Sequence, residues 1–148
     1  TFESELEKYV NILLFFCTEN FESLSSYVVS QGLIETQATI KDDTVLFDIH
    51  YPLSIQKDTA QFTLEDFSYT VNARLGDVLS VIDQIEESQK IDKKGWCINC
   101  ISNAAEEFDM YIHLKDYDDE TIIFYIIDER SRVKEDAYVF TFAHRYEK

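Results

Sequence analysis

The sequence predicts an α+β fold: an antiparallel sheet of about six strands with three helices. Two long stretches repeat apolar side chains at steps of three and four, the spacing of a helix with one buried face. Other stretches alternate apolar and polar side chains, as half-buried strands do. The chain has 148 residues, 45% of them hydrophobic, which is enough to bury a core without a metal or a disulfide. We therefore expect residues 1–148 to form a single domain.

The first expected helix covers residues 3–29 and carries a wide apolar stripe. Apolar side chains recur at helical spacing from Leu6 to Val28. Phe15 and Phe16 widen the stripe, so we expect this helix to be buried on more than one side. The other two helices repeat the spacing over shorter lengths, residues 73–90 and 96–108.

Six segments have the composition of strands: residues 34–40, 44–55, 61–71, 110–114, 121–127 and 137–145. Pro52 lies within the second segment and cannot donate a ladder hydrogen bond, so it indicates an edge, a bulge or a bend. The run from Ile122 to Ile127 is apolar on both faces, which is typical of a central strand covered on both sides.

A faint repeat relates residues 1–72 to residues 73–148. The segment Thr44-Val-Leu-Phe-Asp-Ile is similar to Thr121-Ile-Ile-Phe-Tyr-Ile, at an offset of 77 residues. Lys57-Asp58 and Lys134-Glu135 fall at the same offset, in the turn that follows. Each half has the order helix, strand, strand, strand. The alternative interpretation is that any two half-buried hairpins resemble each other this much.

The charge is strongly negative. Lys and Arg number 13 against 29 Asp and Glu, a net charge of −16. A field of this sign repels phosphate backbones and anionic membranes, so we expect no nucleic-acid partner. With three glycines in the chain, Gly-rich phosphate loops are absent, and no cofactor is expected. The longest apolar run, Ile12 to Cys17, is far shorter than the roughly 20 residues of a spanning helix.

Three cysteines, Cys17, Cys97 and Cys100, form an odd set. Cys97 and Cys100 have the C-x-x-C spacing of a thioredoxin-type redox site, but the segment before them is charged and no proline follows. We expect instead a structural disulfide from Cys17, on the apolar stripe of the first helix, to Cys100 or to Cys97. Cys100 is favoured because it lies deeper in its helix and shares a face with Ala104. No histidine has a diagnostic spacing, so no metal site is expected.

No catalytic constellation is evident. His50, His113 and His144 lie on three different expected strands, and no nucleophile elbow accompanies them. The Asp116–Glu120 segment is rich in carboxylates, as calcium loops are, but it lacks the glycine and the distal glutamate of an EF-hand. A solvated turn is the simpler expectation.

Surface contact, rather than a deep pocket, is the expected mode of action. Bulky aromatic side chains fill the expected core and leave little room for a ligand: Phe15, Phe47, Phe62, Phe124, Phe140 and Phe142. The acidic surface favours a partner with cationic or polar groups. The candidate contact residues are exposed aromatics and the acidic turn: Tyr69, Tyr117, Asp116, Asp118 and Asp119.

Six short motifs occur in an order that is more specific than any one of them. They are Val45-Leu-Phe-Asp-Ile-His-Tyr-Pro-Leu-Ser-Ile, Phe62-Thr-Leu-Glu-Asp-Phe, Arg74-Leu-Gly, Cys97-Ile-Asn-Cys100, Ile123-Phe-Tyr-Ile-Ile-Asp and Tyr138-Val-Phe-Thr-Phe-Ala-His-Arg-Tyr146. In this order the chain resembles a family of uncharacterised, membrane-anchored ectodomains from small-genome, DPANN-type archaea. The resemblance implies one transmembrane helix ahead of Thr1, an extracytoplasmic domain and a further cysteine upstream. It implies no activity.

The sequence thus predicts a non-enzymatic binding or assembly domain, anchored at the surface of an archaeal cell. The partner would be a protein or an envelope polymer. Two alternatives remain: an extracytoplasmic thiol-redox protein using Cys97 and Cys100, and a cytosolic acidic adaptor with reduced cysteines. A count of free thiols separates the three.

Overall fold

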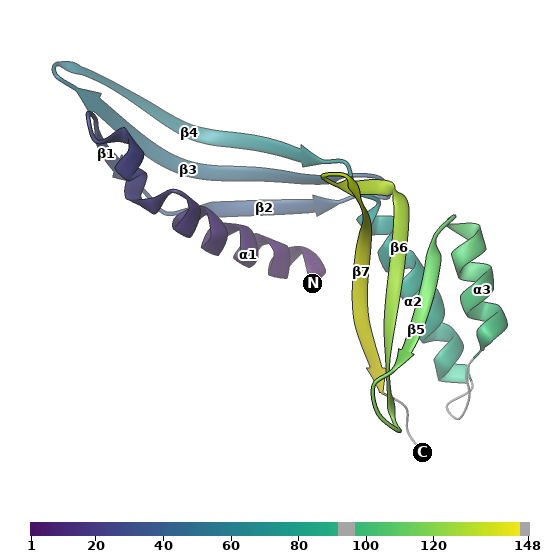
Figure 1. The fold of residues 1–148 in the computed structure, drawn as a ribbon. Coiled ribbons are helices and arrows are strands. Elements are labelled where there is room, and N and C mark those ends of the chain that lie inside the picture. Colours follow the sequence, from purple (N-terminus) through teal and green to yellow (C-terminus); the bar gives the residue numbers. More distant parts are fainter. Residues whose placement is uncertain (92–96, 146–148) are drawn as a thin grey trace. The chain divides into compact units, whose positions relative to one another are not determined.

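The computed structural model describes residues 1–91 and 97–145 and confirms the α+β class (Figure 1). The described part contains three α-helices, one 3-10 helix and seven strands. The strands form two antiparallel sheets, of four and three strands, where the sequence predicted one sheet of about six. Each strand pairs with strands close to it in the chain, so two local sheets replace one continuous sheet. The chain forms two compact units: unit 1 is Thr1–Ile40 with Val45–Val71, and unit 2 is Lys41–Thr44 with Asn72–Lys148.

Unit 1 combines a helix with a four-stranded sheet built around one long strand. Its elements are α1 (Phe2–Cys17), the 3-10 helix η1 (Glu19–Leu24), β1 (Val28–Gln31), β2 (Glu35–Ile40), β3 (Val45–Lys57) and β4 (Ala60–Val71). β1 and β2 pair with successive parts of one edge of β3, and β4 pairs with its other edge. The β3–β4 register shifts between His50 and Leu53, so Pro52 lies at an irregularity, as predicted.

The first helix is shorter than predicted, because α1 ends at Cys17 instead of residue 29. Phe21 follows with a φ of 58°, in the left-handed region that breaks a helix. Residues 28–31 then pair with β3 as a strand, a setting that suits the β-branched Val28 and Val29. No residue of α1 is buried, and Phe16 is 67% exposed. The expectation that this helix is buried on more than one side is therefore wrong.

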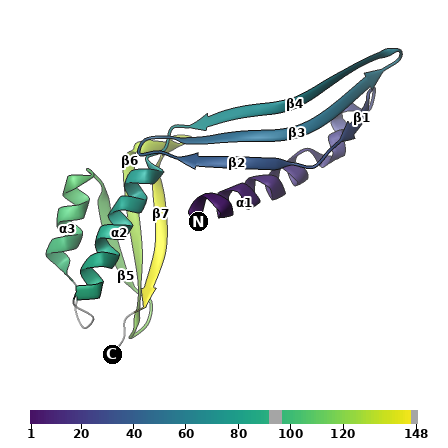
Figure 2. The same cartoon turned by 180° about the vertical axis from the view of Figure 1, so that it is seen from behind.

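Unit 2 packs two helices against a three-stranded sheet (Figure 2). Its elements are α2 (Leu75–Ile91), α3 (Ile98–Glu107), β5 (Tyr111–Asp116), β6 (Thr121–Val133) and β7 (Asp136–Arg145). β6 is the central strand, as predicted. Ile122, Phe124 and Ile126 are buried, while the residues between them are half-buried, so one face of β6 is covered more fully than the other. None of the described helices has the length and apolar content needed to span a membrane.

The hairpins β3–β4 and β6–β7 share several features. β3 and β6 each have 13 residues, and each contains one register shift. The turn in each hairpin begins with a residue of positive φ, 53° at Asp58 and 62° at Lys134. These two hairpins include most of the two similar segments from which the repeat of residues 1–72 and 73–148 was predicted.

A buried ionic cluster connects the start of α2 to β6 in unit 2. Arg74 Nη1 lies 3.0 Å from Asp128 Oδ1, and Arg74 Nε lies 2.9 Å from Asp77 Oδ2. Its Nη2 donates to the carbonyl oxygen of Phe108 at 2.7 Å, and its backbone N–H donates to Ser131 Oγ at 2.8 Å. The Asp128 side chain is fully buried. Because each charge meets a partner, the cluster fixes Arg74 of the Arg74-Leu-Gly motif in a structural role.

Candidate functional site

Polar side chains of α1 cap the free edge of β2 in unit 1. Residues four apart on the helix meet alternate residues of the strand: Glu3 Oε1 accepts the N–H of Ile40 at 3.2 Å, Glu7 Oε1 accepts the N–H of Ala38 at 3.0 Å, and Asn11 Oδ1 accepts the Thr36 hydroxyl at 2.6 Å. Four helical residues rise about 6.0 Å and two strand residues about 6.6 Å, so the two spacings match. The polar side of α1 is therefore committed to the sheet.

Most of the large apolar side chains of α1 are exposed, while Leu6, Val10 and Leu14 are half-buried. Those with large exposed fractions are Tyr9 61%, Ile12 56%, Leu13 40%, Phe15 56% and Phe16 67%. An ordinary surface helix turns its apolar stripe toward the core, whereas α1 keeps only Leu6, Val10 and Leu14 partly covered and leaves most of its large apolar side chains exposed. Cys17, at the end of this face, is exposed too. This exposed face of α1 is a feature that the apolar periodicity alone could not reveal.

An open hollow of about 590 Å³ lies beside the exposed face of α1. Ile12, Phe15 and Phe16 line one side of it, and Leu33 and Tyr51 contribute from the sheet and its connection. Leu33 is 81% exposed although it is apolar. The hollow is an apolar depression of the surface rather than an enclosed pocket.

A second open hollow, of about 570 Å³, has acidic and polar walls. Directly paired residues share a face of the sheet, and two rows of them line the hollow: Glu35, His50 and Asp66, then Gln37, Asp48 and Ser68. His50 Nδ1 lies 2.8 Å from Asp66 Oδ1, and this hydrogen bond raises the pKa of His50 above its ordinary value. In the described part of the chain, no hydroxyl or thiol is hydrogen-bonded to His50. The row therefore lacks the nucleophile–base contact of a hydrolase.

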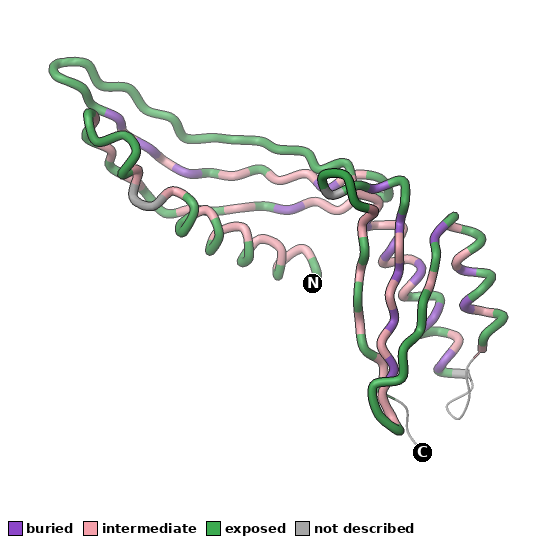
Figure 3. Tube along the Cα trace, in the orientation of Figure 1, coloured by how far each residue is buried: buried purple, intermediate pink, exposed green. Residues whose placement is uncertain are grey.

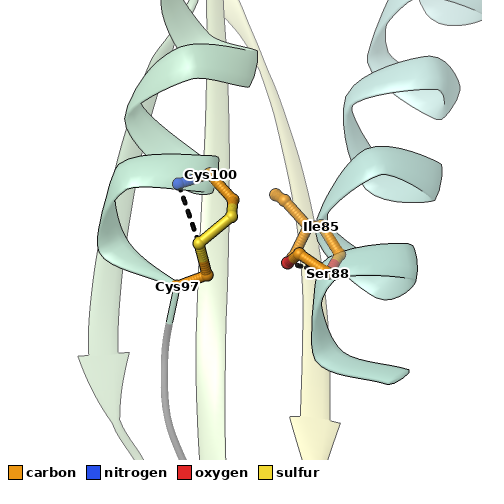
Figure 4. Close-up of a disulfide and its surroundings, with 4 residues drawn as sticks. All are labelled: Ile85, Ser88, Cys97 and Cys100. Atoms are coloured by element: carbon orange, nitrogen blue, oxygen red, sulfur yellow. Dashed lines mark hydrogen bonds between the residues drawn. A yellow bond between two sulfur atoms is a disulfide. The ribbon is translucent and has the colours of Figure 1, made fainter. Parts of the chain in front are cut away.

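The cysteines pair differently from the expectation. Cys97 and Cys100 form a disulfide at the start of α3, with their Cα atoms 5.1 Å apart (Figure 4). Cys17 is a free thiol, so the predicted bridge from Cys17 to Cys100 or Cys97 is wrong. One helical turn brings the two cysteines of the C-x-x-C together, whereas Cys17 lies on the solvent-facing side of α1. Cys97 is also the N-cap of α3, and its Sγ accepts the N–H of Cys100 at 3.2 Å.

Tyr69 and Tyr117 are exposed, as their role as candidate contact residues requires, at 67% and 72%. Tyr69 belongs to β4 of unit 1, and Tyr117 belongs to the β5–β6 turn of unit 2. Asp116, Asp118 and Asp119 lie at the same turn as Tyr117.

The acidic turn uses part of its charge internally. Asp118 Oδ1 accepts the N–H of Glu120 at 2.9 Å, and this hydrogen bond lowers the pKa of Asp118. Glu120 in turn forms an ion pair with Arg145 at 2.9 Å. Within residues 1–91 and 97–145, no three His, Cys, Asp or Glu side chains are grouped so that they could hold a metal ion. The turn is thus organised by its own hydrogen bonds.

The aromatic core expected from the sequence is only partly formed. Phe124 is fully buried and stacks on Phe142 at a centroid distance of 4.7 Å. Phe15 and Phe62, by contrast, are 56% and 49% exposed, so placing them in the core is wrong. Every residue of β4 is exposed, and the strand is green along its whole length in Figure 3. The exposed β4 is the second surface that sequence analysis missed.

Comparison with protein-family models, curated proteins and solved structures finds no match, so the site itself carries the functional argument.

Proposed function

We propose that this chain is a non-enzymatic binding or assembly domain that acts at the outside of an archaeal cell membrane, with unit 1 as its contact surface. The observation that supports this proposal is that the exposed apolar side chains are unevenly distributed between the two units. Among the described residues, fourteen of the nineteen large exposed hydrophobic side chains belong to unit 1. Ile12, Phe15, Phe16 and Leu33 among them line one open hollow, and exposed apolar patches of this kind mark interaction sites.

The charge of unit 1 supports a protein partner with basic groups. Unit 1 has ten Asp and Glu but two Lys, a net charge of −8. Opposite charge on the partner would steer the encounter, and the apolar side chains would supply contact area. The disulfide between Cys97 and Cys100 supports an oxidising compartment, where such bonds persist. The resemblance to membrane-anchored ectodomains points the same way.

Photo-crosslinking at two equally exposed positions tests the proposal. Phe16 of unit 1 and Ile98 of unit 2 are both 67% exposed, so a photoreactive side chain at either has the same access to solvent. We expect irradiation of cells that display the full-length protein to give one discrete protein adduct from position 16 and none from position 98. The same adducts from both positions, or none from position 16, would contradict the proposal.

Thiol-redox chemistry is the second candidate, and the position of Cys97 favours it. After reduction, a Cys97 thiolate would accept the N–H groups of the first turn of α3, which would lower the pKa of the thiol. The rate of alkylation of the reduced protein as a function of pH measures this pKa. A redox role requires Cys97 to ionise well below the ordinary thiol value of about 8.5. The exposed Cys17 serves as an internal reference.

A further inference from the structure

Strand β4 has one paired and one open edge. It pairs with β3 along its length, and no other described strand pairs with it. All twelve of its residues are exposed. An open edge presents unpaired backbone N–H and C=O groups, which are a template for a further strand.

The opposite margin of the sheet in unit 1 is treated differently. There, Glu3 and Glu7 accept the outward N–H groups of Ile40 and Ala38, so the edge of β2 is occupied by side chains of α1. Native proteins usually block their sheet edges in some such way. Protection of one edge and openness of the other indicate that β4 is the edge available to a partner.

The turn defines which groups of β4 point outward. Lys57 pairs with Ala60 across a two-residue turn, so these two residues exchange hydrogen bonds. Hydrogen bonding alternates along an antiparallel pair, which directs the N–H groups of Gln61 and Thr63 away from β3. These two amides mark the open edge near the hairpin tip.

Charge decides what could pair with β4. A second copy of the chain is disfavoured, because two-fold antiparallel pairing of two β4 strands about their middle places Glu65 opposite Glu65, or Asp66 opposite Asp66, of the other copy. Like charges directly opposite each other destabilise a sheet. Asp66 also extends a face that carries Asp48 and Glu35. A strand with basic side chains on that face would instead meet opposite charge.

We propose that β4 accepts an extended segment of a partner protein as an added strand, and that this segment alternates Lys or Arg with apolar residues. The basic side chains would lie beside the acidic row that ends in Asp66. The apolar ones would lie beside Phe67 and Tyr69, which are 39% and 67% exposed. This inference rests on the proposed function and names the edge and the chemistry of the partner.

Peptide binding to the whole chain tests the inference. The probes are two labelled ten-residue peptides, one alternating Lys with Val and the other alternating Glu with Val, measured by fluorescence anisotropy at low salt. We expect the Lys peptide to bind and to weaken as salt rises, and the Glu peptide not to bind. The variant Asp66→Asn, which removes the carboxylate beside the proposed basic side chains, should weaken the Lys peptide several-fold. Equal binding of both peptides would overturn the proposed partner chemistry.

The variant Thr63→Pro addresses the backbone. It removes an outward N–H, and proline is tolerated on an edge strand when its nitrogen faces solvent. We expect about tenfold weaker binding of the Lys peptide, because one backbone hydrogen bond is lost. Thr63→Ala keeps the N–H and should bind within a factor of about two. Circular dichroism spectra and melting curves of both variants establish that the fold is retained.

Hydrogen exchange of the unmodified chain provides a test that needs no variant. Saturating Lys peptide should slow exchange of the Gln61 and Thr63 amides. Protection of β5 or β7, the edge strands of unit 2, in place of these amides would overturn the assignment to β4. Protection that rises with protein concentration without peptide would show a second copy as the occupant. If Thr63→Pro leaves peptide binding unchanged while position 16 still crosslinks its partner, strand addition fails and the proposed function stands.

Discussion

The side chain of Glu7 accepts a hydrogen bond from the backbone N–H of Ala38 at 3.0 Å, and this contact holds one side of α1 against the edge of β2. Glu7 is a charged residue that is half-buried beside the sheet, while Tyr9, Phe15 and Phe16 of the same helix are exposed. Ala38 is buried, with 5% of its surface exposed, so water cannot replace the acceptor freely. The pair therefore helps to determine which side of α1 stays exposed.

Replacing Glu7 tests this relationship. Glu7→Leu leaves the Ala38 N–H without an acceptor and should lower the free energy of unfolding by about 1–3 kcal/mol. Glu7→Gln keeps an acceptor oxygen and should cost much less. Urea denaturation measures both, and exchange of the Ala38 amide reports the contact directly. Equal destabilisation by the two variants would show that the hydrogen bond is not the source of the effect.

The buried pair of Arg74 and Asp128 should be far more important to stability than a surface pair. Asp128→Ala leaves the Arg74 guanidinium, which is 14% exposed, without its buried partner, and we expect a loss of about 3–5 kcal/mol. Glu120→Gln breaks the exposed pair with Arg145 and should cost at most about 1 kcal/mol. Thermal denaturation of the two variants compares these losses of stability. Similar costs for both variants would contradict the assignment of Arg74 to a buried structural cluster.

Gly76 permits a close backbone approach in unit 2. A Cβ atom added there would lie 2.5 Å from the carbonyl oxygen of Lys41, and the Gly76 N–H donates to the same oxygen at 3.2 Å. Alanine normally stabilises a helix by up to about 1 kcal/mol relative to glycine. Here the clash should dominate, and Gly76→Ala should destabilise by about 1–3 kcal/mol. An increase in melting temperature would refute this.

His50 should titrate at a higher pH in the folded chain than in the unfolded chain. The hydrogen bond to Asp66 raises the pKa of His50 above 6.5, its ordinary value, when the chain is folded. The pair therefore stabilises the fold fully below pH 6.5, and this contribution disappears as the pH rises through the elevated pKa. Asp66→Asn should return the pKa of His50 toward 6.5, as followed by NMR titration of the imidazole. Glu35→Gln, directly opposite His50 on β2, should lower it less.

The sequence by itself determined the elements with strong local patterns. Alternation of apolar and polar residues predicted β3, and the central apolar run predicted β6. Helical spacing predicted the start of α2 to within two residues. Pro52 marked an irregularity because a missing N–H acts locally, whatever surrounds it. These features depend on neighbours within a few residues, so the sequence carries them directly.

The tertiary structure alone decided where the faces point and how the strands are grouped. Periodicity shows that α1 has an apolar face, but it does not show that β2 offers its edge N–H groups to Glu3 and Glu7 or that most of the large apolar side chains of α1 stay exposed. Residues 28–31 became a strand because β3 offers a partner, and Cys100 bonds Cys97 because one helical turn brings the two together. Such outcomes depend on contacts between distant segments, and a face that is apolar in sequence is buried only if another element covers it.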